Sequence, residues 1–220
     1  MYKEIKEEII DVARQAQREG LCKHKSGNFS VLDRENGLLI VSPSGIDREA
    51  LTTDDMVVMS MEGEVIENIS GTKPSSESLM HIAIYKVRSD VRAIVHTHSK
   101  YASVFAVLKK PIPPFLYESM YLGCEGHTVP VAPYGRPGTD ELAKNAAAAM
   151  RTGNACLLEA HGAVAADPKG IREAYLTACY LEELCEIYHH VLSCNGGKEP
   201  DLLPAEELSK WSYPSEIKIG

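Results

Sequence analysis

Three histidines in two separate parts of the chain have the residue types and spacing of a metal site. His96 and His98 flank a threonine in an apolar run with strand character, and residues two apart on a strand point to the same face. His161 follows another apolar strand and precedes Gly162, so a tight turn can bring its ring toward a neighbouring strand end. A catalytic zinc binds about three protein ligands, commonly imidazoles, and keeps one position open. Core or turn histidines are the alternative for each residue alone, but the three together favour a metal site.

The other histidines fit this site less well. His24 and His127 lie in polar stretches and are expected to be solvated. His189 and His190 are neighbours in a helical pattern, so they face different directions and cannot chelate one ion together. His81 lies four residues after Glu77 on the same predicted helix face, and a structural role behind the metal is favoured over direct ligation.

Small polar turns predict a second function, the binding of a phosphate group. Ser75 and Ser76 precede a predicted helix that runs to about Val87, with Ser76 as its cap and Glu77 in its first turn. Free amides at a helix N-terminus bind anions. The turns at Gly27-Asn28 and Ser44-Gly45 offer further polar groups. The predicted phosphate-binding residues are Asn28, Ser44, Gly45, Ser75 and Ser76.

A metal site beside a phosphate site suits the cleavage of a small sugar phosphate. Breaking a carbon–carbon bond next to a carbonyl leaves an enolate, and a divalent metal stabilises that charge as a Lewis acid. A carboxylate near the metal can move the proton on the enolate carbon, and a tyrosine is a suitable proton donor to the aldehyde oxygen. The pattern therefore predicts a retro-aldol reaction.

Alternating helical and strand patterns predict one α/β domain over residues 1–220. Adjacent short strands form apparent hairpins, with helices at intervals, which favours a layered α/β/α domain with a largely antiparallel sheet over a strict βαβ series. The helices are expected at about 2–19, 76–87, 100–108, 139–150 and 170–192. The strands are expected at 29–32, 37–41, 56–59, 65–66, 92–98, 129–132, 155–158 and 163–165. The tail after Gly197, which carries Trp211 and Tyr213, has only a loose pattern.

The composition argues against nucleic-acid and membrane partners and is typical of a cytoplasmic protein. A formal net charge of -8 argues against a nucleic-acid binder, because a phosphate backbone favours a basic surface. No apolar run approaches the roughly 20 residues of a membrane span, and the charged N-terminus does not resemble a signal peptide. Six cysteines without a Cys-x-x-Cys pair are expected to be reduced thiols in a cytoplasmic protein.

Six segments, in order and spacing, resemble the class II aldolase/epimerase family, which includes L-fuculose-1-phosphate aldolase. The similarity runs from about Glu8 to about Leu192. It is carried by Ser26-Gly27-Asn28-Phe29-Ser30, Ser42-Pro43-Ser44-Gly45, Lys73-Pro74-Ser75-Ser76-Glu77, His96-Thr97-His98-Ser99, Ala132-Pro133-Tyr134 and His161-Gly162.

The resemblance implies the family's layered fold and a cyclic homotetramer with active sites between subunits. It implies one zinc on His96, His98 and His161, with Glu77 as a further ligand that becomes the acid/base when substrate binds. It implies that the five phosphate-binding residues hold dihydroxyacetone phosphate, and that Tyr117 of a neighbouring subunit protonates the aldehyde oxygen, with Tyr121 as an alternative. The implied substrate is L-fuculose 1-phosphate or a similar deoxyketose phosphate.

Two related enzyme classes, one unrelated fold and one non-enzymatic module are the alternatives to an aldolase. Ribulose-phosphate 4-epimerases resemble the first half of the chain but usually carry Asp at the position of Glu77. Sugar-acid phosphate decarboxylases resemble the stretch at 134–138, where Arg136-Pro137 departs from the fuculose enzyme, but tend to have Lys in place of Ser76. A cupin dioxygenase places its glutamate shortly after His-x-His on an all-β scaffold, unlike Glu77. An adducin-like interaction module would be expected to lack the zinc ligands.

Overall fold

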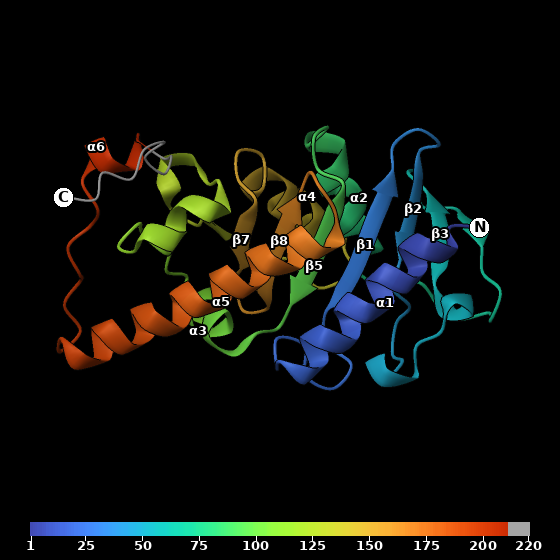
Figure 1. The fold of residues 1–220 in the computed structure, drawn as a ribbon, viewed down its shortest axis with the longest axis horizontal. Coiled ribbons are helices and arrows are strands. Elements are labelled where there is room, and N and C mark those ends of the chain that lie inside the picture. Colours follow the sequence, from blue (N-terminus) through green and yellow to red (C-terminus); the bar gives the residue numbers. More distant parts are fainter. Residues whose placement is uncertain (211–220) are drawn as a thin grey trace, which may run out of the picture.

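The computed structural model describes residues 1–210, and Figure 1 shows their helices arranged around one sheet. Trp211 and Tyr213 lie outside the described residues. The strands are β1 Asn28–Asp33, β2 Leu38–Val41, β3 Val57–Ser60, β4 Val65–Glu67, β5 Ala93–Thr97, β6 Val131–Ala132, β7 Ala155–Leu158 and β8 Gly162–Asp167. The α-helices are α1 Lys3–Arg18, α2 Ser78–Val87, α3 Lys100–Leu108, α4 Asp140–Ala149, α5 Ile171–Cys194 and α6 Ala205–Leu208. Short 3-10 helices cover Arg48–Ala50, Thr53–Asp55, Tyr117–Leu122 and Glu125–His127.

The sheet is largely antiparallel, as predicted. Its strand order is β4-β3-β2-β1-β5-β8-β7-β6. Every neighbouring pair is antiparallel except β6 with β7, so the short β6 is the parallel edge strand. The predicted hairpins β1–β2 and β7–β8 both form. The central pairing of β1 with β5 and of β5 with β8 brings together strands from distant parts of the sequence.

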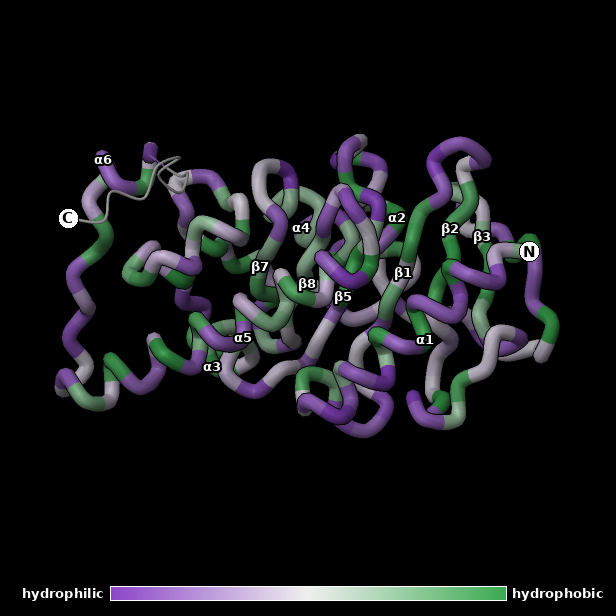
Figure 2. Tube along the Cα trace, in the orientation of Figure 1, coloured by the Kyte–Doolittle hydropathy of each residue, from purple (hydrophilic) through white to green (hydrophobic). Residues whose placement is uncertain are grey.

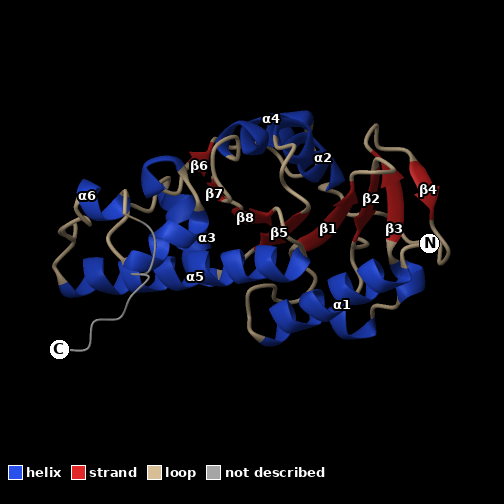
Figure 3. Cartoon of the chain, turned by 45° about the horizontal axis from the view of Figure 1, so that its top comes forward, coloured by secondary structure: helices blue, strands red, loops and turns tan. Residues whose placement is uncertain are grey.

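Helices cover both faces of the sheet, which gives the predicted three layers. Figure 3 shows α2 and α4 on one side of the strands and α1 and α5 on the other. Successive strand residues enter opposite cores, because side chains alternate across a strand. On β5, Val95 packs with α1 and α5 residues, whereas Ile94 packs with α2 and α4 residues. The central strands are mostly hydrophobic in Figure 2, while α1 alternates between polar and apolar residues.

The predicted elements were correct to within a few residues, but the start of α2 was wrong. The helix begins at Ser78, so Glu77 occupies the cap position and Ser76 does not cap it. Ser75 organises this turn instead: its hydroxyl accepts a 3.2 Å hydrogen bond from the Glu77 amide. At the start of α4, Thr139 is the cap, and its side chain accepts a hydrogen bond from the Leu142 amide.

Two polar turns that are distant in sequence run side by side at one end of the sheet. Ser44 N–H donates to the Lys73 carbonyl at 2.9 Å, and Ser75 N–H donates to the Ser42 carbonyl at 3.2 Å. Pro43 and Pro74 form an isolated antiparallel bridge between the same segments. These contacts place segment 42–45 against segment 73–76, next to the start of α2. None of the described helices is both long enough and apolar enough to span a bilayer.

Candidate active site

Four side chains converge where β1 begins and β5 ends, at the lower end of both strands in Figure 1. His96 is on β5, His98 follows that strand, His161 lies in the β7–β8 turn, and Glu77 precedes α2. One ligand atom from each residue lies within 4.8 Å of those of the other three. The structure therefore brings together all four residues predicted at the metal.

The distances within this cluster are short. His96 Nε2 lies 3.0 Å from His98 Nε2 and 3.1 Å from Glu77 Oε2. His161 Nε2 lies 3.3 Å from Glu77 Oε1. The ring centroids of the three histidines are 4.7 to 4.8 Å apart. Glu77 and His96 are buried, whereas His98 is the solvent-exposed member.

A close approach between β5 and β8 creates this arrangement. A Cβ atom added to Gly162 would lie 2.3 Å from the Thr97 carbonyl oxygen and 3.2 Å from the His98 ring. A larger residue would therefore push the start of β8, and His161 beside it, away from the other two ligands. Glycine at this position allows two separate segments to share one site.

The electrostatics of the cluster fit a bound cation. His96 Nδ1 lies 2.9 Å from the Ala163 carbonyl, so Nδ1 carries the proton and the Nε2 lone pair points at the other ligands. Burial, and then the proximity of His96, lower the pKa of His161 to about 4, so its ring is neutral at physiological pH. Glu77 Oε1 is buried and has no hydrogen-bond partner among the described residues. Three imidazoles and a carboxylate that face one another in this way form a metal-binding cluster.

Glu77 is ionised in this environment. Burial raises the pKa of the Glu77 carboxyl, but its interaction with His96, and then with His161 and Asn28, outweighs burial and holds the pKa well below the usual range. The carboxylate is thus a base and a potential metal ligand.

A buried chain of hydrogen bonds supports Glu77 from behind. Asn28 Nδ2 donates to Glu77 Oε2 at 2.8 Å, and Asn28 Oδ1 lies 2.6 Å from His81 Nε2. His81 Nδ1 lies 2.6 Å from the Ser30 hydroxyl, which in turn lies 3.0 Å from the Tyr85 hydroxyl. Both ring nitrogens of His81 are engaged in this chain, so its position agrees with the predicted structural role behind the metal site. The sequence did not predict that Asn28 would contact Glu77.

The predicted phosphate-binding residues line one pocket of about 260 Å³ that opens onto the metal cluster. The pocket also contains two cations, Lys25 and Arg48, which were not predicted from the sequence. Lys25 precedes the predicted turn at Gly27-Asn28, and Arg48 begins the 3-10 helix Arg48–Ala50. The predicted members of its lining are Asn28, Ser44, Gly45, Ser75, Ser76, Glu77, His98 and His161.

Tyr117 does not line this pocket in its own chain. It is 43% exposed at the start of the 3-10 helix Tyr117–Leu122, which packs against α5. Tyr121, on the same short helix, stacks on Tyr180 with ring centroids 4.7 Å apart. A role for either tyrosine at the metal therefore requires a second copy of the chain.

Comparison with known proteins agrees with this geometry. The profile described as "Class II Aldolase and Adducin N-terminal domain" matches residues 7–189. A 5-deoxy-D-ribulose 1-phosphate aldolase from Bacillus thuringiensis serovar kurstaki is 37% identical, with 92% of this chain and 91% of the relative aligned. A 5-methylthioribulose-1-phosphate/5-deoxyribulose-1-phosphate aldolase from Rhodospirillum rubrum is 39% identical, with 92% and 86% aligned.

Solved structures give the same result. A structure described as L-fuculose 1-phosphate aldolase superposes with a TM-score of 0.86 at 38% identity, and the match covers 94% of this chain and 93% of the other. The profile, the sequence relatives and the fold agree over most of the chain. The protein therefore belongs to the metal-dependent class II aldolase and adducin N-terminal domain family.

Proposed function

We propose that the protein is a zinc-dependent aldolase that cleaves a ketose 1-phosphate to dihydroxyacetone phosphate and a short aldehyde. The observation that carries this proposal is the shared pocket: Ser44 and Ser75 lie on its wall together with Glu77, His98 and His161. A substrate with its phosphate near the serines can therefore present its carbonyl and hydroxyl oxygens to the metal cluster.

The names of the relatives support this substrate class. The two sequence relatives described above are aldolases of 5-deoxyribulose 1-phosphate, and one also acts on the methylthio analogue. The structural relative is an aldolase of L-fuculose 1-phosphate. All of these substrates are ketose 1-phosphates. They share the part that carries the phosphate and the carbonyl group, and they differ in the part that is released as the aldehyde. The substrate of this chain is proposed to come from the same set.

The metal is proposed to be zinc, held by His96, His98 and His161 with Glu77 as the fourth ligand in the absence of substrate. Three imidazoles and a carboxylate are ligands that zinc accepts in catalytic sites. When bound, it supplies Lewis-acid stabilisation of the negative charge that develops on the substrate oxygens.

Glu77 is proposed to move the proton on the dihydroxyacetone phosphate fragment. In a retro-aldol cleavage, the hydroxyl on the β-carbon loses its proton as the bond breaks, and the α-carbon then gains one. Glu77 has the required ionised state, and Asn28 fixes its orientation from the side of the protein core. It can therefore hold a proton when substrate displaces it from the metal and deliver it to the α-carbon.

Tyr117 of a neighbouring subunit is proposed to exchange a proton with the oxygen that becomes the aldehyde oxygen. Its exposed position at the surface of one chain is compatible with a site completed in a homotetramer. A phenol near that oxygen can exchange the proton of the β-hydroxyl as the bond breaks or forms.

Product analysis tests this function. The zinc-loaded enzyme is offered dihydroxyacetone phosphate with a panel of short aldehydes, and products are identified by mass spectrometry and NMR. New ketose 1-phosphates are expected. An epimerised pentose phosphate would indicate the epimerase, and carbon dioxide released from a sugar-acid phosphate would indicate the decarboxylase. A protein that binds no zinc and catalyses none of these reactions would favour a non-enzymatic, adducin-like module.

A further inference from the structure

Arg48 is a fully buried cation in the wall of the substrate pocket. It lies on the 3-10 helix Arg48–Ala50, only 1% of its surface is exposed, and it lines the pocket together with Ser44 and Ser75. Neither the metal cluster nor the hydrogen-bond chain behind Glu77 uses it. Its burial therefore needs a separate explanation.

Within the part of the chain that the structure describes, the guanidinium of Arg48 forms no ion pair with a carboxylate, and Asp47 interacts with it only at longer range. Its Nη2 donates to the carbonyls of Ser26 and Gly27, and Nη1 donates to the Ile46 carbonyl. Among the described residues, no carboxylate lies within 4.0 Å of it, and its buried Nε has no hydrogen-bond partner. Burial lowers the pKa of Arg48 from its usual value, which shows that the site disfavours a lone positive charge.

Lys6 shows how this protein treats another buried cation. Lys6 is 2% exposed, and its ammonium group pairs with Glu67 Oε1 at 2.5 Å. A buried charge without such a partner is costly. The difference is that Arg48 faces a ligand pocket and Lys6 does not. An anionic ligand in that pocket would supply the missing partner.

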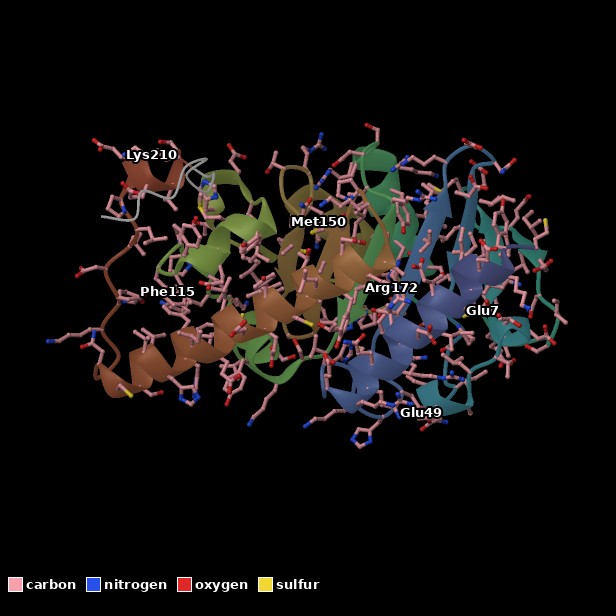
Figure 4. All side chains as sticks on the ribbon, viewed as in Figure 1. Glu7, Glu49, Phe115, Met150, Arg172 and Lys210 are labelled. Atoms are coloured by element: carbon pink, nitrogen blue, oxygen red, sulfur yellow. The ribbon has the colours of Figure 1, made fainter. Side chains whose placement is uncertain are left out.

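The surroundings hold Arg48 in place. Gln17 Oε1 accepts a hydrogen bond from the Arg48 amide, and the Asp47 side chain accepts from the amide of Glu49. Figure 4 labels Glu49 next to the end of α1, where it pairs with Arg18 at 2.7 Å. The guanidinium carbon also lies 5.8 Å from the centre of the Phe29 ring. A charge fixed in this way can act on a ligand without reorganising.

Arg48 also fixes the turn that leads to Asn28. The carbonyls that it binds belong to residues 26 and 27, and Gly27 has a left-handed φ of 77°. A Cβ atom at Gly27 would lie 2.4 Å from Cys22 Sγ and 2.6 Å from the His96 carbonyl oxygen. The guanidinium thus holds a tightly packed turn between the metal cluster and the phosphate-binding residues.

We propose that Arg48 is the buried counter-charge of the substrate's phosphate group and selects phosphorylated ligands. This inference rests on the proposed function, because it assigns the pocket to a ketose 1-phosphate. Lys25 lines the same pocket but is exposed, so water screens its charge more strongly. Arg48 therefore contributes the larger share of the charge selectivity.

Binding of inorganic phosphate to the zinc-loaded, full-length enzyme tests the role of Arg48. Isothermal titration gives the Kd for wild type, Arg48→Met, Arg48→Gln and Arg48→Lys. A hydrogen bond to a charged group corresponds to roughly a ten- to hundredfold change in Kd. We expect phosphate binding to weaken by this factor in Arg48→Met and Arg48→Gln. Arg48→Lys keeps the charge, so its Kd is expected to stay within about threefold of wild type.

Arg14→Met is the matched control. Arg14 is a half-buried arginine that donates to the Leu51 carbonyl at 2.9 Å and also has a buried Nε without a partner, but it lies outside the substrate pocket. The same loss of charge there should leave the Kd unchanged. Zinc content and circular dichroism establish that each variant is folded. If Arg48→Met does not fold, the Gln and Lys pair still separates charge from hydrogen bonding.

Two outcomes would overturn the inference. Folded Arg48→Gln that binds phosphate as tightly as wild type would show that the charge is not used, and equal losses in Gln and Lys would show that only the shape of the turn matters. The proposed function fails separately, if no ketose 1-phosphate is cleaved or formed while phosphate binding still depends on Arg48.

Discussion

The side-chain amide of Asn28 joins Glu77 to the protein core. Its nitrogen donates to Glu77 Oε2 at 2.8 Å, and its oxygen lies 2.6 Å from His81 Nε2. All three side chains are buried. The carboxylate therefore has a fixed orientation, with Oε1 turned to His161. Asn28 thus belongs to the support of the proposed acid/base as well as to the wall of the phosphate pocket.

Replacing Asn28 tests this support. Asn28→Ala leaves Glu77 without its orienting donor, and we expect kcat to fall about ten- to hundredfold with zinc content unchanged. Ser44→Ala is the control, because Ser44 lines the pocket at its exposed rim; it should raise KM and leave kcat nearly constant. Steady-state kinetics separates the two effects, and an Asn28→Ala enzyme altered only in KM would contradict the orienting role.

Glu77→Gln tests the proton transfer itself. The amide keeps the shape of the side chain but cannot hold the transferred proton, so we expect turnover to fall by about 10²- to 10⁴-fold. The three histidines remain, so most of the zinc should be retained. Cleavage rates and metal analysis are measured on the same preparation. Turnover close to wild type would show that another group moves the proton.

Tyr117→Phe tests the contribution of the neighbouring subunit. We expect slower aldol cleavage, about 10²-fold or more, while exchange of the α-carbon hydrogen of dihydroxyacetone phosphate with deuterated water continues, because that step uses Glu77. Tyr121→Phe is the control on the same 3-10 helix. Equal loss of cleavage and exchange in Tyr117→Phe, or loss of cleavage only in Tyr121→Phe, would rule out the assignment.

His81 makes the stability of the fold dependent on pH. Burial, together with the proximity of His96, lowers the pKa of His81 to about 3 in the folded protein, whereas an unfolded histidine titrates near 6.5. Below about pH 6.5, His81 binds a proton in the unfolded chain but stays unprotonated in the folded chain. The free energy of unfolding should then fall by up to about 1.4 kcal/mol per pH unit as the pH decreases, and this contribution is fully present above that pH.

Urea denaturation between pH 4.5 and 7.5 measures this effect. The comparison uses wild type and His81→Gln, both with chelator so that the metal does not contribute. The difference between the two curves should be constant above about pH 6.5 and should shrink below it. A difference that is independent of pH across the whole range would show that His81 has the same pKa in the folded and unfolded protein, so that burial does not lower it.

Local patterns in the sequence predicted the three metal-site histidines and the strands and helices that carry them, whereas Glu77 as a metal ligand was implied by the family resemblance. His96 and His98 are two apart at the end of an apolar strand, and His161 lies in a short hairpin turn, so the sheet itself brings them together. The first residue of α2 was not predicted correctly. Ser75 and Ser76 are equally good caps in isolation, and the pairing of Ser75 with Ser42 in the folded chain shifts the helix to Ser78.

Arg48 and the chain of hydrogen bonds behind Glu77 depend on contacts between distant segments. An arginine after Ile46-Asp47 has no periodicity that marks it as buried, and its burial arises from carbonyls 21 and 22 residues earlier in the sequence. The Asn28 side chain joins β1 to Glu77 across 49 positions. The position of Tyr117 relative to a substrate depends on an assembly, which no single-chain pattern describes.

Anomalous X-ray diffraction at the zinc absorption edge tests the central claim most directly. We expect one strong peak per subunit, about 2.0–2.1 Å from a ring nitrogen of each of His96, His98 and His161, in crystals of the active enzyme. No peak at that position, or an ion bound elsewhere while the enzyme still cleaves its substrate, would contradict the account.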